Sequence, residues 1–309
     1  MNIHEQYMER AIYLAQKGRG KVSPNPMVGC VIVKNGKIIG EGYHKKFGGK
    51  HAEVVAIQNA GSGLAGSTAY INLEPCCTEG KTPPCTKTLI ENKIKKVVIS
   101  MLDPNPKIKG KGVQELKKNG IEVLSGVFEI QARELNKGFI KWITKGIPWV
   151  IGKAAQSFNG YLGMDSSSQT RITNQQCKED VHRLRSGVDC VLVGRQTILT
   201  DDPELTVRDI AGRSPKRAVL DSRLSLAQSY QIFEQTEPDT IVLHSNVIKN
   251  VKSKEGIKYL GVREDKNGLD VNDILVKLGR QGITTLLVEG GAGVLKSFYK
   301  ADVLDEIYI

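Results

Sequence analysis

The chain has 309 residues, 40% of them hydrophobic, so it is too long for one average domain and can bury more than one core. No stretch approaches the roughly 18 apolar residues of a membrane-spanning helix, and the first ten residues are too polar for a signal peptide. We therefore expect a soluble, cytoplasmic protein. Lys and Arg outnumber Asp and Glu by 44 to 33, a balance that suits anionic ligands but selects no partner by itself.

The first half alternates between helix and strand patterns. Apolar residues recur every three or four positions before Gly18, which predicts a helix, and Asn35-Gly36 predicts a tight turn between two strands. Helices and strands are then predicted in alternation over 51–60, 69–73, 86–92, 97–101, 113–119 and 121–124, with a last helix over 131–142. Such alternation predicts a three-layer α/β domain, and 145–148 resembles a linker.

A second alternating set follows the linker. Strands are predicted over 149–153, 190–193, 218–221, 240–244 and 285–288, and helices over 175–185, 271–279 and 294–299. We therefore expect domains of residues 1–146 and 147–309. The chain stops inside an apparent strand, 306–309, so we expect that a further strand or two of the second domain is missing at its C-terminus.

Three of the six cysteines, Cys76, Cys77 and Cys85, lie within ten positions. In a cytosolic chain, clustered cysteines bind metal more often than they form disulfides. One imidazole, from His51, and two thiolates would leave the fourth position of a zinc ion for water, which is the arrangement of a catalytic site. The other cysteines, Cys30, Cys177 and Cys190, lie in or near apolar runs and are interpreted as small buried hydrophobes.

Glu53 follows His51 by two residues and is the candidate proton shuttle, because a carboxylate in a closed site can act first as base and then as acid. H-x-E followed by P-C-x-x-C is the signature of zinc base deaminases; here eight residues separate Cys76 from Cys85. Cys77 competes with Cys76 as a ligand. We prefer Cys76 because it follows Pro75, and Cys85 because a helix N-terminus favours its thiolate.

Several segments of the first half together resemble the RibD family, the bifunctional deaminase-reductases of riboflavin biosynthesis. The matching segments are Pro-Asn-Pro-Met-Val-Gly at 24–29, His-Ala-Glu at 51–53, Leu-Glu-Pro-Cys at 73–76, Gly-Lys-Thr-Pro-Pro-Cys at 80–85, Asp-Pro-Asn-Pro at 103–106 and Gly-Lys-Gly at 110–112. The resemblance covers nearly the whole chain. It implies a cytidine-deaminase-like three-layer domain followed by a dihydrofolate-reductase-like α/β domain.

For the first domain, the resemblance implies zinc ligands His51, Cys76 and Cys85, with Glu53 as the proton shuttle. The implied reaction removes the ring amine of a diaminopyrimidine that carries a phosphoribosylamino group. The residues implied to contact this phosphorylated substrate are Asn25, His44 and Lys81. A lysine beside the metal also suits an anionic group on electrostatic grounds.

For the second domain, the resemblance implies an NADPH-dependent reductase that opens the ribosyl group into ribityl. The segments that carry it include 152–155, 181–185, 189–194, 197–203, 205–208 and 288–291. The residues implied to bind NADPH are Lys153, Ala155, Thr197, Asp201, Ser222, Gly290 and Gly291, and those implied to bind substrate are Leu205, Arg208 and Glu289. The sequence has no G-x-G-x-x-G, so NADPH rests on the resemblance alone.

The sequence departs from the family pattern at three places. Cys77-Thr78 replaces a common Ser-His, residues 157–161 read Ser-Phe-Asn-Gly-Tyr instead of Ser-Leu-Asp-Gly-Lys, and Arg171 replaces a common Trp. Because Asn159 and Tyr161 remove an acid and a base, an alternative is a deaminase whose second domain is a degenerate reductase.

Two further alternatives belong to other classes. A nucleic-acid-editing deaminase would fit the basic charge, but the long cysteine spacing and the lack of a concentrated basic and aromatic stripe argue against it. A binding module with a structural zinc would normally have four protein ligands. We expect an enzyme that binds neither nucleic acid nor membrane, and the two domains are compatible with a homodimer.

Overall fold

The computed structural model describes residues 2–79, 83–162, 172–249, 251 and 254–309. The chain forms two compact units, Met1–Lys145 and Gly146–Ile309. The boundary between the units therefore falls one residue before the position expected from the sequence. In the part of the chain that the structure describes, no helix is both long and apolar enough to cross a membrane.

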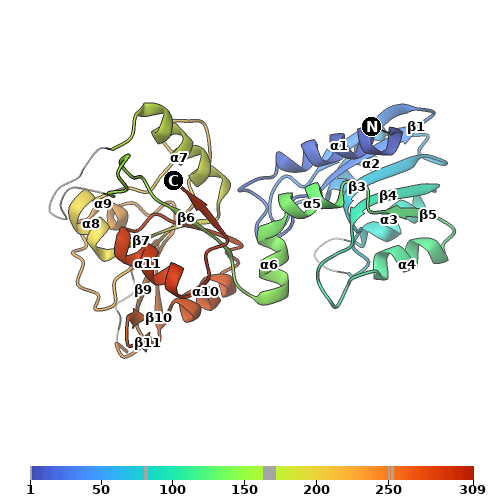
Figure 1. The fold of residues 1–309 in the computed structure, drawn as a ribbon. Coiled ribbons are helices and arrows are strands. Elements are labelled where there is room, and N and C mark those ends of the chain that lie inside the picture. Colours follow the sequence, from blue (N-terminus) through green and yellow to red (C-terminus); the bar gives the residue numbers. More distant parts are fainter. Residues whose placement is uncertain (1, 80–82, 163–171, 250, 252–253) are drawn as a thin grey trace. The chain divides into compact units, whose positions relative to one another are not determined.

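The first unit is built on a five-stranded mixed sheet (Figure 1). Its order is β2-β1-β3-β4-β5, in which β3, β4 and β5 are parallel and β1 is antiparallel to both neighbours. The strands are β1 (Gly29–Lys34), β2 (Lys37–Tyr43), β3 (Thr68–Leu73), β4 (Lys96–Met101) and β5 (Glu122–Ser125). The β1–β2 connection is the Asn35-Gly36 turn, where both residues have the positive φ that this two-residue turn requires.

Helices cover both faces of this sheet, so the three-layer prediction is confirmed. One core cluster joins Ala52 and Ala56 of α2 (Ala52–Ala60), Leu89 of α3 (Cys85–Glu91) and Leu116 of α4 (Lys111–Lys118) to one face. Alternate strand residues on the opposite face pack against α1 (Ile3–Gln16) and α5 (Glu129–Leu135). The alternation of side chains along each strand thus supplies both apolar faces.

The single helix predicted over 131–142 was wrong. The structure has two helices there, α5 (Glu129–Leu135) and α6 (Lys137–Lys145), which meet at Asn136. Asn136 is buried, and its side-chain amide binds both backbone groups of Met27. The chain bends where this tertiary contact requires it, which helical periodicity does not reveal.

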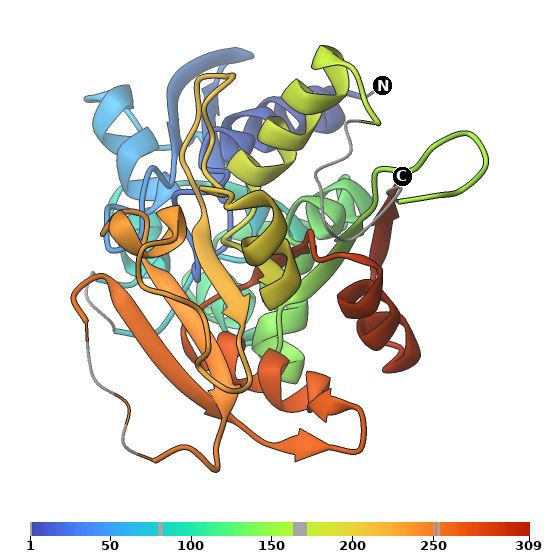
Figure 2. The ribbon, with the colours of Figure 1, turned by 90° about the vertical axis from the view of Figure 1, so that its left-hand side faces the viewer.

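The second unit contains a seven-stranded sheet in which every neighbouring pair is parallel. Its order is β10-β9-β8-β7-β13-β6-β14. The strands are β6 (Trp149–Lys153), β7 (Cys190–Gly194), β8 (Lys216–Leu220), β9 (Thr240–Ser245), β10 (Ile257–Val262), β13 (Thr285–Val288) and β14 (Glu306–Tyr308). Figure 2 shows β9 and β10 in orange from a second direction.

Two core clusters lie on opposite faces of this sheet. One packs α10 (Val271–Arg280) and α11 (Ala292–Lys300) against the strands, and the other includes residues from α7 (Gln175–Gly187), α8 (Arg195–Asp201) and α9 (Gln231–Glu234). Of these elements, α8, α9, strand β10 and the small hairpin of β11 (Glu264–Asp265) and β12 (Gly268–Leu269) were not predicted. Helices α8 and α9 and the two hairpin strands are too short to show a long apolar period.

Candidate functional site

The first cluster of chemical groups is arranged around the N-terminus of α2. His51 is the N-cap residue of this helix, and Glu53 lies in its first turn. Helix α2 packs closely on β2 because two strand residues are glycines: a Cβ atom on Gly42 would lie 2.5 Å from the carbonyl oxygen of Ala52. The absence of side chains at this contact therefore helps to fix where His51 and Glu53 lie.

Cys76 and Cys85 reach the same place from two other elements. Cys76 lies in the loop after β3, and Cys85 is the first residue of α3. Nδ1 of His51 is 3.2 Å from Sγ of Cys85 and 3.5 Å from Sγ of Cys76, and the backbone N–H of Cys85 donates to Sγ of Cys76. All three ligand atoms lie within 4.8 Å of one another.

This donor set fits zinc. With Zn–S bonds of about 2.3 Å and Zn–N bonds of about 2.1 Å, a tetrahedral ion with one nitrogen and two sulfur ligands holds these atoms roughly 3.6 to 3.8 Å apart. The observed separations are close to that range. Cys77, the alternative ligand, is not part of the cluster, which is consistent with a choice between adjacent residues that cannot both face one ion.

Protons and a metal ion would compete for the same atoms of this cluster. A hydrogen bond from the Cys85 thiol lowers the pKa of Cys76 to about 4, and the same contact raises the pKa of Cys85. The hydrogen bond with Cys76 also raises the pKa of His51. The two sulfur atoms thus share a proton and a negative charge, and a cation that displaced the proton would gain two thiolates.

Glu53 is suited to proton transfer. Its side chain is buried beside the cluster, and burial raises the pKa of its carboxyl, to which the charge of Cys76 adds. A carboxyl group whose pKa is moved toward neutrality can both accept and release a proton during one reaction.

Two of the predicted substrate contacts lie next to this cluster. Nδ2 of Asn25 is 3.1 Å from Nε2 of His44, and the rings of His44 and His51 meet edge to face at 5.6 Å. Nδ1 of His44 is 3.0 Å from the carbonyl oxygen of Lys50, and burial lowers the pKa of His44. The neutral ring therefore donates to Lys50 and accepts from Asn25. Lys81 lies outside the described residues.

Sequence reasoning missed the residues that hold these loops. Asn72, buried inside β3, accepts from the backbone N–H of Gly29 and donates to the carbonyl oxygen of Met27, close to Asn25 in sequence. Glu74, also buried, accepts hydrogen bonds from the backbone N–H groups of three residues between 103 and 113. The available signal was a polar residue within an apolar strand pattern, for Asn72, and directly after it, for Glu74.

The predicted reductase residues gather along the carboxyl ends of the parallel strands. Lys153 ends β6 and Ala155 follows it, Thr197 and Asp201 lie on α8 after β7, and Ser222 comes two residues after β8. From β6 the chain adds β7 to β10 on one side of the sheet, and it then returns to place β13 between β7 and β6 and β14 on the other side of β6. The order of strand addition therefore reverses near β6, which makes this a topological switch point. Ligands of open parallel sheets bind at this kind of position.

Gly290 and Gly291 form the turn between β13 and α11. A Cβ atom on Gly290 would lie 2.6 Å from the side chain of Val294, whereas one on Gly291 would meet nothing within 4 Å. Gly291 is the N-cap residue of α11, where backbone N–H groups point out of the helix. The open space at this helix start fits the close approach of a dinucleotide diphosphate.

Leu205, Arg208 and Glu289 lie on the segments after β7 and β13. Glu289 forms a paired ion contact with Arg185 of α7, at 2.8 and 2.9 Å, and Arg185 also donates to the carbonyl oxygen of Thr206. Arg208 is half-exposed, and its Nη1 lies 2.9 Å from Glu204. Arg185 was not predicted as a site residue, although it falls within a family segment.

The departures from the family pattern lie on loops. Asn159 and Tyr161 are exposed in the turn after β6, where Oγ of Ser157 donates to Oδ1 of Asn159. Cys77 is half-buried beside Cys76, and burial raises its pKa. Arg171 lies outside the described residues. Cys77, Asn159 and Tyr161 do not belong to the His51, Cys76 and Cys85 cluster.

Two family models match the chain. The model for the cytidine and deoxycytidylate deaminase zinc-binding region matches residues 1–101, and the model for the RibD C-terminal domain matches residues 148–309. The fold and the site thus define a zinc-dependent deaminase joined to a reductase. Zinc is the cofactor of the first part and NADPH that of the second.

Similar proteins identify the family. The riboflavin biosynthesis protein RibD of Aquifex aeolicus is 42% identical over 99% of this chain and 86% of its own length, and that of Escherichia coli is 38% identical over the same shares. A solved structure of Acinetobacter baumannii RibD matches 99% of the chain and 85% of its own, at 37% identity and a TM-score of 0.90. The chain belongs to the RibD family and is a bifunctional deaminase and reductase of riboflavin biosynthesis.

A second solved structure carries a more specific description. It is a diaminohydroxyphosphoribosylaminopyrimidine deaminase/5-amino-6-(5-phosphoribosylamino)uracil reductase from Thermotoga maritima, 39% identical over 97% of this chain and 84% of its own, with a TM-score of 0.88.

Proposed function

We propose that this chain hydrolytically deaminates 2,5-diamino-6-(5-phosphoribosylamino)pyrimidin-4(3H)-one and then reduces the ribosyl side chain of the product to ribityl with NADPH. The observation that carries the first step is the cluster of His51, Cys76 and Cys85 with the buried Glu53 beside it. The second step is supported by the match to the RibD C-terminal domain and by the description of the Thermotoga relative.

In the deamination, His51, Cys76 and Cys85 hold the zinc ion, which acts as a Lewis acid that makes water nucleophilic at neutral pH. Glu53 accepts a proton from the attacking water and delivers it to the ring amine. The amine leaves as ammonia, and the oxygen of the water becomes the ring carbonyl.

We assign the binding of the pyrimidine to the group of Asn25 and His44. Their polar atoms lie beside His51 and are held in one orientation by the backbone of Lys50. Lys81 is assigned to the anionic phosphoribosyl group because a cation lowers the free energy of a bound phosphate.

In the reduction, NADPH supplies a hydride, and the chain orients it against the ribosyl group. We assign NADPH binding to residues at the carboxyl edge of the sheet, namely Lys153, Ala155, Thr197, Asp201, Ser222, Gly290 and Gly291. Leu205, Arg208 and Glu289 are assigned to the substrate. The half-exposed guanidinium of Arg208 suits its phosphate, since arginine binds phosphate through several N–H groups at once.

The test is to incubate the purified chain with the diaminopyrimidine ribosyl phosphate, with and without NADPH, while following ammonia and NADPH absorbance separately. We expect ammonia in both samples and NADPH oxidation in the second. Ammonia alone would leave a deaminase with a degenerate reductase unit, the alternative raised by Asn159 and Tyr161. If neither ammonia release nor NADPH oxidation is seen, the proposed substrate is rejected.

We further propose that the enzyme acts in the cytoplasm as a homodimer. The free state of all six cysteines supports a reducing compartment. The division of the chain into two units is compatible with a homodimer. Light scattering of the purified chain tests the dimer, and a monomer at micromolar concentration would exclude it.

A further inference from the structure

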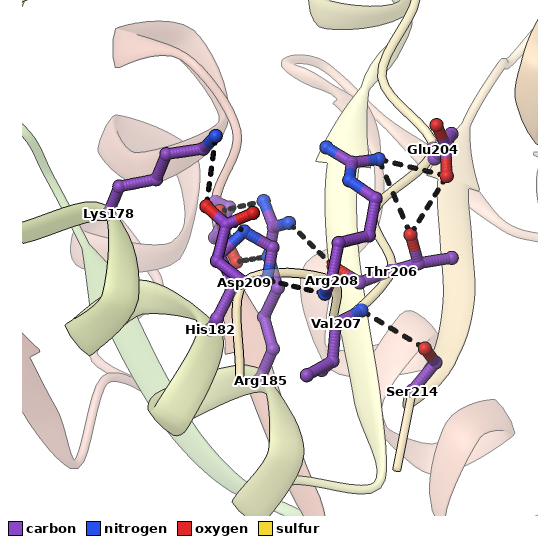
Figure 3. A network of polar contacts seen from close by, with 10 residues as sticks. Lys178, His182, Arg185, Glu204, Thr206, Val207, Arg208, Asp209 and Ser214 are labelled. Carbon is purple, nitrogen blue, oxygen red and sulfur yellow. Dashed lines mark hydrogen bonds and ion pairs between the residues drawn. The ribbon is translucent and has the colours of Figure 1, made fainter. Parts of the chain in front are cut away.

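Helix α7 presents a row of basic side chains to the segment that carries Arg208. Lys178, His182 and Arg185 are spaced by four and three residues, which places them on one face of the helix. Figure 3 shows all three pointing from this helix toward the residues between Glu204 and Asp209.

The segment that they face has no regular structure of its own. Residues 202–215 contain no helix or strand, and Leu205 has a φ of +56°, which is uncommon for a leucine. Side chains therefore hold this segment. Arg185 donates to the carbonyl oxygen of Thr206, and Ser214 accepts from the backbone N–H of Val207.

His182 holds the next position along the segment. It is 2% exposed, and its Nδ1 accepts the backbone N–H of Arg208 at 3.1 Å. Because Nδ1 is the acceptor, the proton of the neutral ring is on Nε2. Nε2 lies 3.6 Å from Oδ2 of Asp209, which forms an ion pair with Lys178 at 2.9 Å. The imidazole is thus held by a hydrogen bond at Nδ1 and faces a carboxylate, beyond hydrogen-bond distance, at Nε2 (Figure 3).

The hydrogen bond from the backbone N–H of Arg208 to His182 fixes the position of the Arg208 backbone, from which the arginine side chain extends. Its guanidinium is 45% exposed and is oriented by Glu204 at 2.9 Å and by Oγ1 of Thr206 at 3.4 Å. A backbone that is fixed at Arg208 keeps this guanidinium in place with little loss of conformational freedom when an anion binds.

We propose that His182 is a positioning residue of the reductase, which fixes the backbone at Arg208 and so orients its guanidinium toward the phosphate of the deaminated intermediate. This role rests on the proposed function, because it takes the reductase substrate to be phosphorylated. His182 itself does not touch the substrate.

The chemistry of imidazole gives this role a pH dependence. The charged groups that face His182 are Lys178 and Arg185 on its own helix and Arg208 and Asp209 on the opposite segment. Burial lowers the pKa of His182, the three cations lower it further, and Asp209 opposes them. At neutral pH the ring is therefore an acceptor. As the pH falls below the ordinary histidine value of about 6.5, protonation places a hydrogen on Nδ1, directly opposite the N–H of Arg208.

The test compares the unchanged chain with His182→Asn and His182→Leu. The oxygen of an asparagine side chain occupies about the position of Nδ1 and does not titrate, whereas leucine fills the space without an acceptor. The KM for the deaminated phosphoribosylamino intermediate is measured between about pH 5.5 and 8, with ammonia release by the first unit as the control in the same molecule.

We expect His182→Leu to raise this KM roughly tenfold at neutral pH, because a buried N–H loses its acceptor. We expect His182→Asn to keep the neutral-pH KM and to show a smaller acid-side rise of KM than the unchanged chain, namely the part that comes from protonation of the substrate phosphate, whose second pKa is about 6. Deamination is unchanged in both variants.

A wild-type KM in a folded His182→Leu chain would overturn the role, and so would an acid-side rise of KM that is as large in His182→Asn as in the unchanged chain. If the leucine variant fails to fold, the pH profile of the asparagine variant decides alone. If the wild-type chain oxidises no NADPH, the proposed function and this role are overturned together. The two results named for the His182 variants would overturn only the role.

Discussion

Arg185 and Glu289 form a fork-to-fork ion pair although 104 residues separate them in sequence, with Nε–Oε1 and Nη2–Oε2 distances of 2.8 and 2.9 Å. Both side chains are largely buried, at 13% and 6% exposure. The pair connects α7 to the end of β13, and Arg185 also holds the carbonyl oxygen of Thr206. Three separate segments of the reductase site therefore depend on one guanidinium.

Glu289→Gln should lower the kcat/KM of reduction about a hundredfold or more, because it leaves the Arg185 charge buried without its carboxylate. Deamination should not change. The matched control is Glu179→Gln, since Glu179 pairs with Arg183 on the exposed face of α7. Equal reduction rates in the two variants, measured as NADPH oxidation, would contradict the importance of the pair.

Glu53→Gln should lower ammonia release by a factor of about 10² to 10⁴, the usual contribution of a positioned acid or base. The amide has nearly the same shape, so zinc content by atomic absorption should stay at the wild-type level. NADPH oxidation with the deaminated intermediate as substrate is the control for folding. A variant with bound zinc and full ammonia release would rule out the proton-shuttle role.

Removal of the metal should separate the two activities. A chelator should abolish ammonia release and leave reduction of the deaminated intermediate intact, because the His51, Cys76 and Cys85 cluster contains residues of the first unit only. Added zinc should restore the lost activity.

Among the adjacent cysteines, Cys76→Ser should lose zinc and Cys77→Ser should keep it, since only Cys76 lies with His51 and Cys85. Zinc content per chain is the measurement. Loss of zinc from the Cys77 variant alone would mean that the ligand assignment is wrong.

Glu74→Ala should destabilise the first unit by about 2 to 4 kcal/mol, because three partly buried backbone N–H groups lose their buried acceptor. It should also weaken zinc binding, since Glu74 lies two residues before Cys76. The control is Glu79→Ala, an exposed residue of the same loop. The difference in stability is measured by thermal unfolding of each variant. Equal unfolding midpoints of the Glu74 and Glu79 variants would show that the loop is held by other contacts.

The pattern of the sequence predicts most of the elements that carry the site. The positions of His51 before a helix, of Cys76 after a buried strand and of Cys85 at a helix start all follow from local signals. Their residue types then indicate zinc, because zinc binds imidazole and thiolate ligands and three of them leave its fourth position for water. The Asn35-Gly36 turn and the alternation of helices and strands are local in the same sense.

Local sequence patterns of this kind do not predict contacts between residues that are distant in the sequence. Asn136 ends α5 because it binds the backbone of Met27, and Glu74 holds a loop 29 to 39 residues away. Each is a single polar residue whose partner is a backbone group, and a backbone group has no signature in the sequence. Their importance is visible only once their burial is known.

The sequence by itself therefore indicated the two α/β domains, the candidate zinc ligands with Cys76 and Cys77 as alternatives, and the candidate proton shuttle, because these depend on residue type and on spacing along a helix or strand. Only the tertiary structure decided the order of the seven parallel strands, which places β13 between β7 and β6. That order brings Glu289 to Arg185, and the packing of α7 brings His182 to Arg208. Pairing between strands depends on the packing of both sheet faces together, so local sequence cannot fix it.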